Sequence, residues 1–164
     1  MISDMRRNRP FSEGTTIVLE IFLGIAAVVC GVLFVIRPNG SLLGMTVADL
    51  IRGPFSDFLV PGVLLALVIG LGMLGAAAMV IQRREHAWRF TVAAGLAMVA
   101  FETVEIVTVR FNPQQLIYGA LGVAVALLGL RLRGLPRSGA AGGHGFAGSM
   151  RPTSAAVGQQ HGRA

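Results

Sequence analysis

The sequence is poor in charge and in cysteine. Asp, Glu, Lys and Arg make up 13% of the 164 residues, and all 14 basic residues are arginine. Soluble domains usually contain about 25% charged residues, so this composition is unusual for a protein that folds in water. The single cysteine, Cys30, excludes an intramolecular disulfide and the Cys-x-x-Cys motif of thiol redox enzymes.

The sequence also lacks a strong catalytic or cofactor motif. The glycine-rich run at 142–145 follows no predicted strand, so it does not indicate nucleotide binding. His144 and His161 are isolated in a Gly- and Ala-rich tail, and we expect no metal site there. The net charge of +6 comes without a nucleic-acid-binding motif. We therefore expect a protein that is not an enzyme, has no cofactor and binds no nucleic acid.

What the sequence does contain is four long apolar runs, at about 15–36, 58–81, 90–109 and 116–130, and the last of these lies in a predicted span at about 112–131. A bilayer core is about 30 Å thick and needs roughly 20 apolar residues per helix. The runs predict an all-α fold, a four-transmembrane-helix antiparallel bundle over 15–133. We expect a cytoplasmic N-terminal segment at 1–14 and a disordered cytoplasmic tail at 134–164, where large apolar residues are scarce.

The arginines predict the orientation of the bundle in the membrane. Nine of them flank one side of the predicted spans: Arg6, Arg7, Arg9, Arg83, Arg84, Arg89, Arg131, Arg133 and Arg137. The other side has three: Arg37, Arg52 and Arg110. Cytoplasmic segments carry the excess of basic residues, so both termini are expected in the cytoplasm, with the chain in a bacterial inner membrane.

The connections between the runs contain turn and capping signals. Apolar residues recur at helical spacing over 41–51, which predicts a short interfacial helix on the outer surface. Ser56 and Asp57 are suited to cap the second span. Asn112 is suited to cap the fourth span, with Pro113 in its first turn.

Two carboxylates inside the third span are the main candidates for a site. Glu102 and Glu105 are one turn apart on one helical face. Gln115 and Tyr118 begin the fourth span at a similar depth, and Asp57 is on the same outer side. The pattern favours either a hydrogen-bonded cluster that fixes the hairpin or an outward-facing pocket for a proton, cation or small polar ligand. A hydrolase with paired carboxylates is a third interpretation, based on spacing alone.

Other residues in the spans admit a structural interpretation. Glu20 is near the cytoplasmic end of the first span, where it could pair with Arg83 or Arg84, or extend to the interface. Small residues at four-residue spacing, such as Gly62 and Ala66, predict close packing within the bundle. A seam between two copies of the chain is the alternative.

The segment 53–62 (GPFSDFLVPG), the Glu102/Glu105 pair and Gln115-x-x-Tyr118 together resemble a group of small four-helix bacterial membrane proteins with no known activity. The resemblance covers about 15–132 and implies a fold and a membrane, but no reaction. We expect a non-enzymatic accessory or interaction module, with the bilayer and a membrane protein or second copy as partners. The alternative is a small transporter or ligand-binding protein that uses the Glu102/Glu105 pocket.

Overall fold

The computed structural model describes residues 11–133, and these residues form helices and no strand. The helices are α1 (Phe11–Ile36), α2 (Leu59–Leu64), the π-helical segment η3 (Leu65–Gly70), α3 (Leu71–Ile81), α4 (Ala87–Thr108) and α5 (Pro113–Arg133). Because α2, η3 and α3 are continuous, four helices are long and apolar enough to cross a membrane. The prediction of an all-helical fold with four helices of this length is confirmed. The predicted tail at 134–164 lies outside the described residues.

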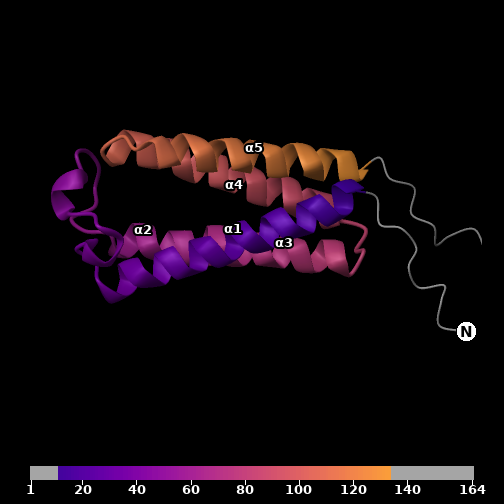
Figure 1. Cartoon of the computed structure of the whole chain (residues 1–164), viewed down its shortest axis with the longest axis horizontal. Coiled ribbons are helices and arrows are strands. Elements are labelled where there is room, and N and C mark those ends of the chain that lie inside the picture. Colours follow the sequence, from indigo (N-terminus) through magenta and orange to yellow (C-terminus); the bar gives the residue numbers. More distant parts are fainter. Residues whose placement is uncertain (1–10, 134–164) are drawn as a thin grey trace, which may run out of the picture.

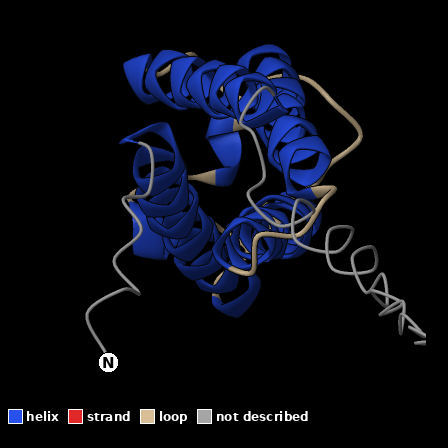
Figure 2. Cartoon of the chain, turned by 90° about the vertical axis from the view of Figure 1, so that its right-hand side faces the viewer, coloured by secondary structure: helices blue, strands red, loops and turns tan. Residues whose placement is uncertain are grey.

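The connections between helices alternate between the two ends of the molecule (Figure 1). The α1–α2 and α4–α5 connections lie at one end, which we call the loop end. The α3–α4 connection lies at the other end, together with the start of α1 and the end of α5, and we call this the terminal end. Figure 2 views the helices from the terminal end, where they surround a common axis. The α3–α4 and α4–α5 connections are short, and the α1–α2 connection at 37–58 is the long one.

Glycines join the helices into two close pairs. In the first pair, α1 with α2–α3, a Cβ added at Gly31 would lie 2.5 Å from the carbonyl oxygen of Gly62. In the second pair, α4 with α5, a Cβ added at Gly95 would lie 2.6 Å from the carbonyl oxygen of Gly122. Backbones approach this closely only where side chains are absent, which is how helices commonly associate in lipid. The predicted packing of small residues within the bundle is thus observed.

Larger apolar side chains fill the interface between the two pairs. Leu23 on α1, Met73 on α3, Met98 on α4 and Val125 on α5 are buried in one cluster. Side chains that point outward on the four helices are also apolar; examples are Phe22, Leu67, Leu96 and Leu127, each more than half exposed. Apolar side chains on both faces are the pattern of helices that lie in a bilayer.

The segment 37–58 differs from the prediction of one interfacial helix over 41–51. It forms two 3₁₀ turns, η1 (Ser41–Leu43) and η2 (Val47–Asp49). Gly44 interrupts the helical pattern with φ +70°, a left-handed conformation suited to glycine. Thr46 then adopts an extended conformation and caps the second turn. Local capping therefore overrides the helical spacing of the apolar residues.

This segment is attached to the start of the α4–α5 connection. The Arg110 N–H donates a hydrogen bond to the Asp49 carbonyl at 2.7 Å, and the Ile51 N–H donates to the Thr108 carbonyl at 3.0 Å. Leu50 and Val109 form an antiparallel bridge beside them. The segment, which begins and ends on the first helix pair, is thus tied to the second pair at the loop end.

Candidate functional site

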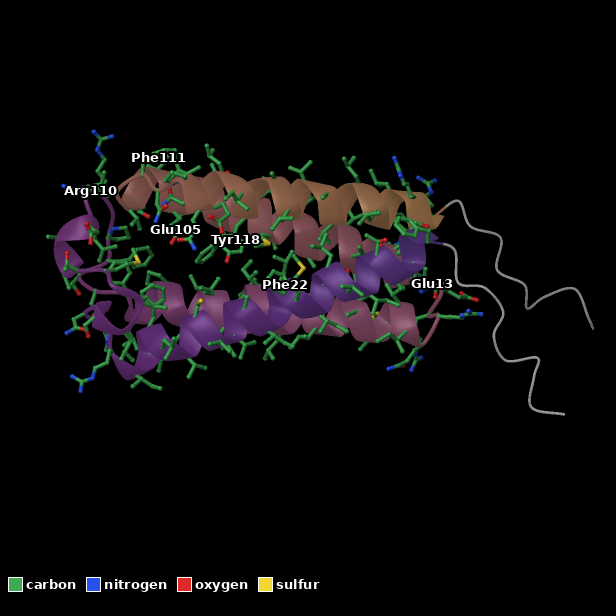
Figure 3. The ribbon with its side chains drawn as sticks, viewed as in Figure 1. Glu13, Phe22, Glu105, Arg110, Phe111 and Tyr118 are labelled. Atoms are coloured by element: carbon green, nitrogen blue, oxygen red, sulfur yellow. The ribbon has the colours of Figure 1, made fainter. Side chains whose placement is uncertain are left out.

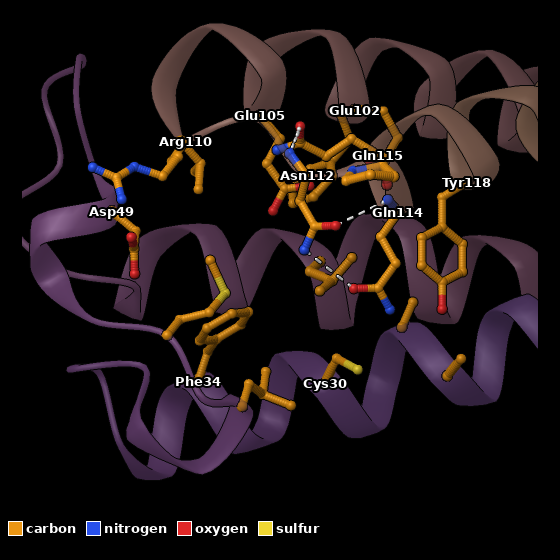
Figure 4. Close-up of a pocket in the computed structure, with 18 of the residues that line it drawn as sticks. Cys30, Phe34, Asp49, Glu102, Glu105, Arg110, Asn112, Gln114, Gln115 and Tyr118 are labelled. Carbon is orange, nitrogen blue, oxygen red and sulfur yellow. Dashed lines mark hydrogen bonds between the residues drawn. The ribbon is translucent and has the colours of Figure 1, made fainter.

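A cavity of about 460 Å³ opens at the loop end, between α1 and the second helix pair (Figure 4). Its floor reaches Leu23 and Met98, and its walls come from α1, α4 and α5. Residues of η1, η2 and their link, among them Met45 and Asp49, line its mouth. The cavity is within the range of volumes that hold small-molecule ligands.

Glu102 and Glu105 both line this cavity, as their spacing predicts. Glu102 is 6% exposed, and its Oε2 has no hydrogen-bond partner among the described residues. Its side chain interacts directly with that of Glu105, which is half-buried. Figure 3 shows Glu105 and Tyr118 pointing from α4 and α5 into the space in front of α1. Two adjoining carboxyl groups at this depth call for a proton or a cation between them.

Gln115 and Tyr118 also line the cavity, but they do not hold the carboxyl groups. Gln115 is instead part of the cap of α5, where its Oε1 accepts a hydrogen bond from the Asn112 N–H at 3.1 Å. The Asn112 Oδ1 in turn accepts from the Gln114 N–H at 3.1 Å, which confirms the predicted cap. The side-chain amide of Gln115 is therefore committed to a structural role at the cavity wall.

The site does not include Asp57, the remaining residue of the predicted set. Asp57 Oδ1 accepts a hydrogen bond from the Leu59 N–H at 3.0 Å, but the N-cap residue of α2 is Phe58, so the structure does not show the N-cap that the sequence suggested for Ser56 or Asp57. Asp57 is absent from the residues that line the cavity. Its carboxylate is directed to the first residue of α2 instead.

Aromatic rings and a pair of opposite charges complete the cavity. Phe34, Phe101 and Tyr118 contribute rings to the wall. Asp49 and Arg110 lie near each other at the mouth (Figure 4). Within the described residues, no salt bridge joins Arg110 to either glutamate. The charges at the mouth thus offset each other, and the two inner carboxyl groups are left without a protein cation.

A second, apolar cavity of about 340 Å³ adjoins the first, between α2 and α4. The two cavities share Phe34, Phe101, Glu105 and Val109. Most of its other walls are aliphatic or aromatic, including Pro61 and Val68. An apolar group bound here would lie directly beside Glu105.

The structure corrects the interpretation of Glu20, for which the sequence suggested an ion pair with Arg83 or Arg84 or a position at the interface. Glu20 is 0% exposed, and Arg83 pairs with Glu13 at 3.7 Å. The polar side chain next to Glu20 is that of Thr91 on α4, which is also 0% exposed. Neither Glu20 oxygen has a hydrogen bond of good geometry. The proximity of Glu20 and Thr91 depends on how α1 and α4 pack, which their sequences do not reveal.

Comparison with known proteins finds no match to a family model, a curated protein or a solved structure. The resemblance noted from the sequence gains no support from it. Residues 11–133 contain no group of three or more His, Cys, Asp or Glu side chains placed to hold a metal ion. The geometry of the cavity is therefore the main guide to function.

Proposed function

We propose that this chain is a non-enzymatic, multi-pass membrane protein that binds a small organic cation in the cavity lined by Glu102 and Glu105. The observation that carries the proposal is the pair of adjoining carboxyl groups that face the cavity without a basic partner. A carboxylate inside a membrane span calls for a compensating charge, and a cationic ligand supplies one.

The surroundings favour an organic cation over a metal ion. Phe34, Phe101 and Tyr118 line the same cavity, and aromatic faces attract organic cations such as quaternary ammonium groups. The adjoining apolar cavity accommodates an uncharged portion of the same molecule. A metal ion would instead require several more oxygen ligands than two carboxyl groups provide.

The alternative of a structural cluster has less support. A cluster that fixed the α4–α5 hairpin would join the glutamates to α5 by hydrogen bonds, and the hydrogen bonds near the start of α5 join Asn112, Gln114 and Gln115 to one another. The hairpin is held instead by the close approach of Gly95 and Gly122. The glutamates are thus available for a ligand.

We propose an antiparallel bundle in a bacterial inner membrane with the loop end outside. Trp88 supports this orientation, because it lies at the terminal end under the guanidinium groups of Arg89 and Arg133, each 5.4 Å from the ring centroid. Tryptophan and arginine are typical of the membrane interface, and an excess of arginine marks its cytoplasmic side. The turns η1 and η2 then lie at the outer interface.

The test is binding of benzyltrimethylammonium, a permanent cation with an aromatic ring, to the full chain in lipid nanodiscs. We expect Glu102→Gln and Glu105→Gln to weaken binding more than tenfold, because each removes a charge that faces the ligand in a poorly solvated site. Glu85→Gln is the matched control, since Glu85 is exposed in the α3–α4 connection. Equal binding of the uncharged analogue neopentylbenzene, or no effect of the glutamate variants, would refute the proposal.

A second candidate function is association with another membrane protein or a second copy of the chain. The supporting observation is that Gly72 and Gly75 on α3 have no atom within 4 Å of an added Cβ, so this small-residue face is open. We expect a Gly72→Leu variant to lose crosslinked oligomers if the face is used. Crosslinking that is unchanged by the substitution would exclude this face as the contact.

A further inference from the structure

The buried carboxyl of Glu20 is the polar group in the described structure that packing and capping explain least. It is 0% exposed, and neither of its oxygens has a hydrogen bond of good geometry. The Oγ1 of Thr91 beside it is also buried and without such a partner. A structural carboxyl group is normally held by donors, because an unpartnered one costs free energy in an apolar interior. Glu20 therefore calls for a role other than support.

Glu20 lies between two of the helices that line the cavity, α1 and α4. It belongs to α1 and meets Thr91 of α4, so it lies in the interface between the two helix pairs. Leu23, one turn further along α1, is at the floor of the cavity. On α4, Thr91 precedes Glu102 by 11 residues, or about 16 Å at about 1.5 Å per residue. The two polar positions thus occupy opposite halves of one interface.

An apolar layer separates these two positions. Leu23, Met73, Met98 and Val125 form it, and each is no more than 4% exposed. Tyr118, which also lines the cavity, packs against this cluster. We expect water or a proton to cross the apolar layer when the helix pairs move relative to each other. Large side chains, rather than close glycine contacts, fill this interface, so such movement leaves each pair intact.

The charged groups of the elements that pack around Glu20 lie toward the terminal end. They include Glu13 on α1, Arg83 and Arg84 after α3, Arg89 on α4, and Arg131 and Arg133 on α5. Arg83 pairs with Glu13, and Arg89 and Arg133 stack on Trp88. None of these groups pairs with Glu20. Glu13 is two turns before Glu20 on α1, toward the terminal end.

We infer that Glu20 is a second proton-binding site, and that protons cross the membrane between it and the Glu102/Glu105 cavity. A carboxylate of the cavity takes a proton from water at the loop end. When the apolar layer opens, the proton passes to the Glu20 carboxylate, which releases it at the terminal end. No bond other than O–H forms or breaks, and no cofactor is required. This inference rests on the proposed cavity site and adds that a bound cation and protons exchange there.

Proton flux into liposomes that contain the full chain tests the inference. The liposomes hold a pH-sensitive dye, with valinomycin and K⁺ to balance charge. We expect the wild-type chain to dissipate an imposed pH gradient faster than empty liposomes, and Glu20→Gln to reduce this flux at least tenfold. Thr16→Val is the control, because Thr16 is equally buried one turn earlier and its hydroxyl is bonded to the Ser12 carbonyl at 2.7 Å.

Benzyltrimethylammonium binding separates this inference from the proposed function. We expect Glu20→Gln to bind the cation as the wild-type chain does. Binding without any proton flux in the wild-type chain would overturn the inference and leave the cavity site standing. If the wild-type chain shows neither cation binding nor proton flux, the proposed function and this inference are both overturned.

Because the Glu20→Gln variant could fail to fold, the same site is also tested by chemical labelling of the wild-type chain. Dicyclohexylcarbodiimide reacts with protonated carboxyl groups in apolar surroundings, and mass spectrometry locates the adduct. We expect labelling of Glu20 and a matching loss of flux. Flux that persists after complete labelling of Glu20 would overturn the inference.

Discussion

Gly95 on α4 and Gly122 on α5 meet backbone to backbone: a Cβ at Gly95 would lie 2.6 Å from both the Gly122 carbonyl oxygen and the Ala126 nitrogen. Backbone atoms cannot rotate away as the end of a long side chain can. The second helix pair therefore depends on the absence of a side chain at Gly95. This contact sets the distance between α4, which carries Glu102, and α5, which carries Gln115 and Tyr118.

The Gly95→Ala variant is expected to be destabilised. The extra methyl group forces α4 and α5 apart, and overpacking of this kind costs about 1–3 kcal/mol. Gly72→Ala is the control, since an added Cβ there meets nothing within 4 Å and alanine favours a helix. Thermal unfolding in detergent measures both variants. Equal melting temperatures would contradict the close contact.

The cap of α5 gives a second prediction. Asn112→Ala removes the oxygen that accepts the Gln114 N–H, and loss of such a cap costs about 1 kcal/mol. Asn39→Ala removes a comparable bond to the Ser41 N–H in the segment 37–58, outside the spans. We expect Asn112→Ala to lower the melting temperature more than Asn39→Ala does. The opposite order would show that the cap contributes little.

Asp49 makes the structure at the mouth depend on pH. The Thr46 N–H, at 2.8 Å, and the Thr46 hydroxyl, at 3.0 Å, donate to its carboxylate and lower the pKa of Asp49 below its usual value of 3.8. Because the folded pKa is the lower one, the carboxylate stabilises the turn at pH values above about 3.8. This contribution is lost as the pH falls through the folded pKa.

NMR of the Thr46 amide proton measures this titration. We expect its chemical shift to change with a midpoint below 3.8 in the wild-type chain. An Asp49→Asn variant should show no such step, and its Thr46 resonance at neutral pH should resemble that of the acidified wild-type chain. A midpoint above 3.8 would contradict the observed hydrogen bonds.

The orientation is testable by cysteine labelling. In a Cys30→Ala background, we expect Ser56→Cys to react with a membrane-impermeant maleimide in intact cells. Glu85→Cys, at the terminal end, should react only after the membrane is opened. Both positions are exposed, so a difference reflects the side of the membrane. Reversed labelling would place the termini outside, and equal labelling of both in intact cells would contradict their separation by a span.

The four long helices were predictable, because a lipid environment restricts the conformations that an apolar segment can adopt. Runs of apolar residues long enough for a bilayer leave helices as the available structure, because backbone groups in lipid must bond within the segment. The segment 41–51 could not be predicted in the same way. Its apolar residues have helical spacing, but Gly44 and the Thr46–Asp49 bonds favour two separate turns. Local capping decides the conformation of short segments.

The candidate site was predictable in part. The one-turn spacing of Glu102 and Glu105 requires that they share a face, and the short connection brings Gln115 and Tyr118 to the same level. Whether these side chains bond to each other or line a cavity depends on tertiary packing. The proximity of Glu20 and Thr91 involves helices that are far apart in sequence, so no local pattern reveals it.

The hydrogen bond from Arg110 to the Asp49 carbonyl joins a segment that starts and ends on the first helix pair to the second pair. It therefore acts as a spacer that keeps the mouth of the cavity at a set width before any ligand arrives. A ligand that finds its space already formed does not have to separate the helices, so less of its interaction energy is lost to rearrangement. The two pairs are thus joined at both ends, by this spacer at the loop end and by the short α3–α4 connection at the terminal end, toward which Glu20 lies.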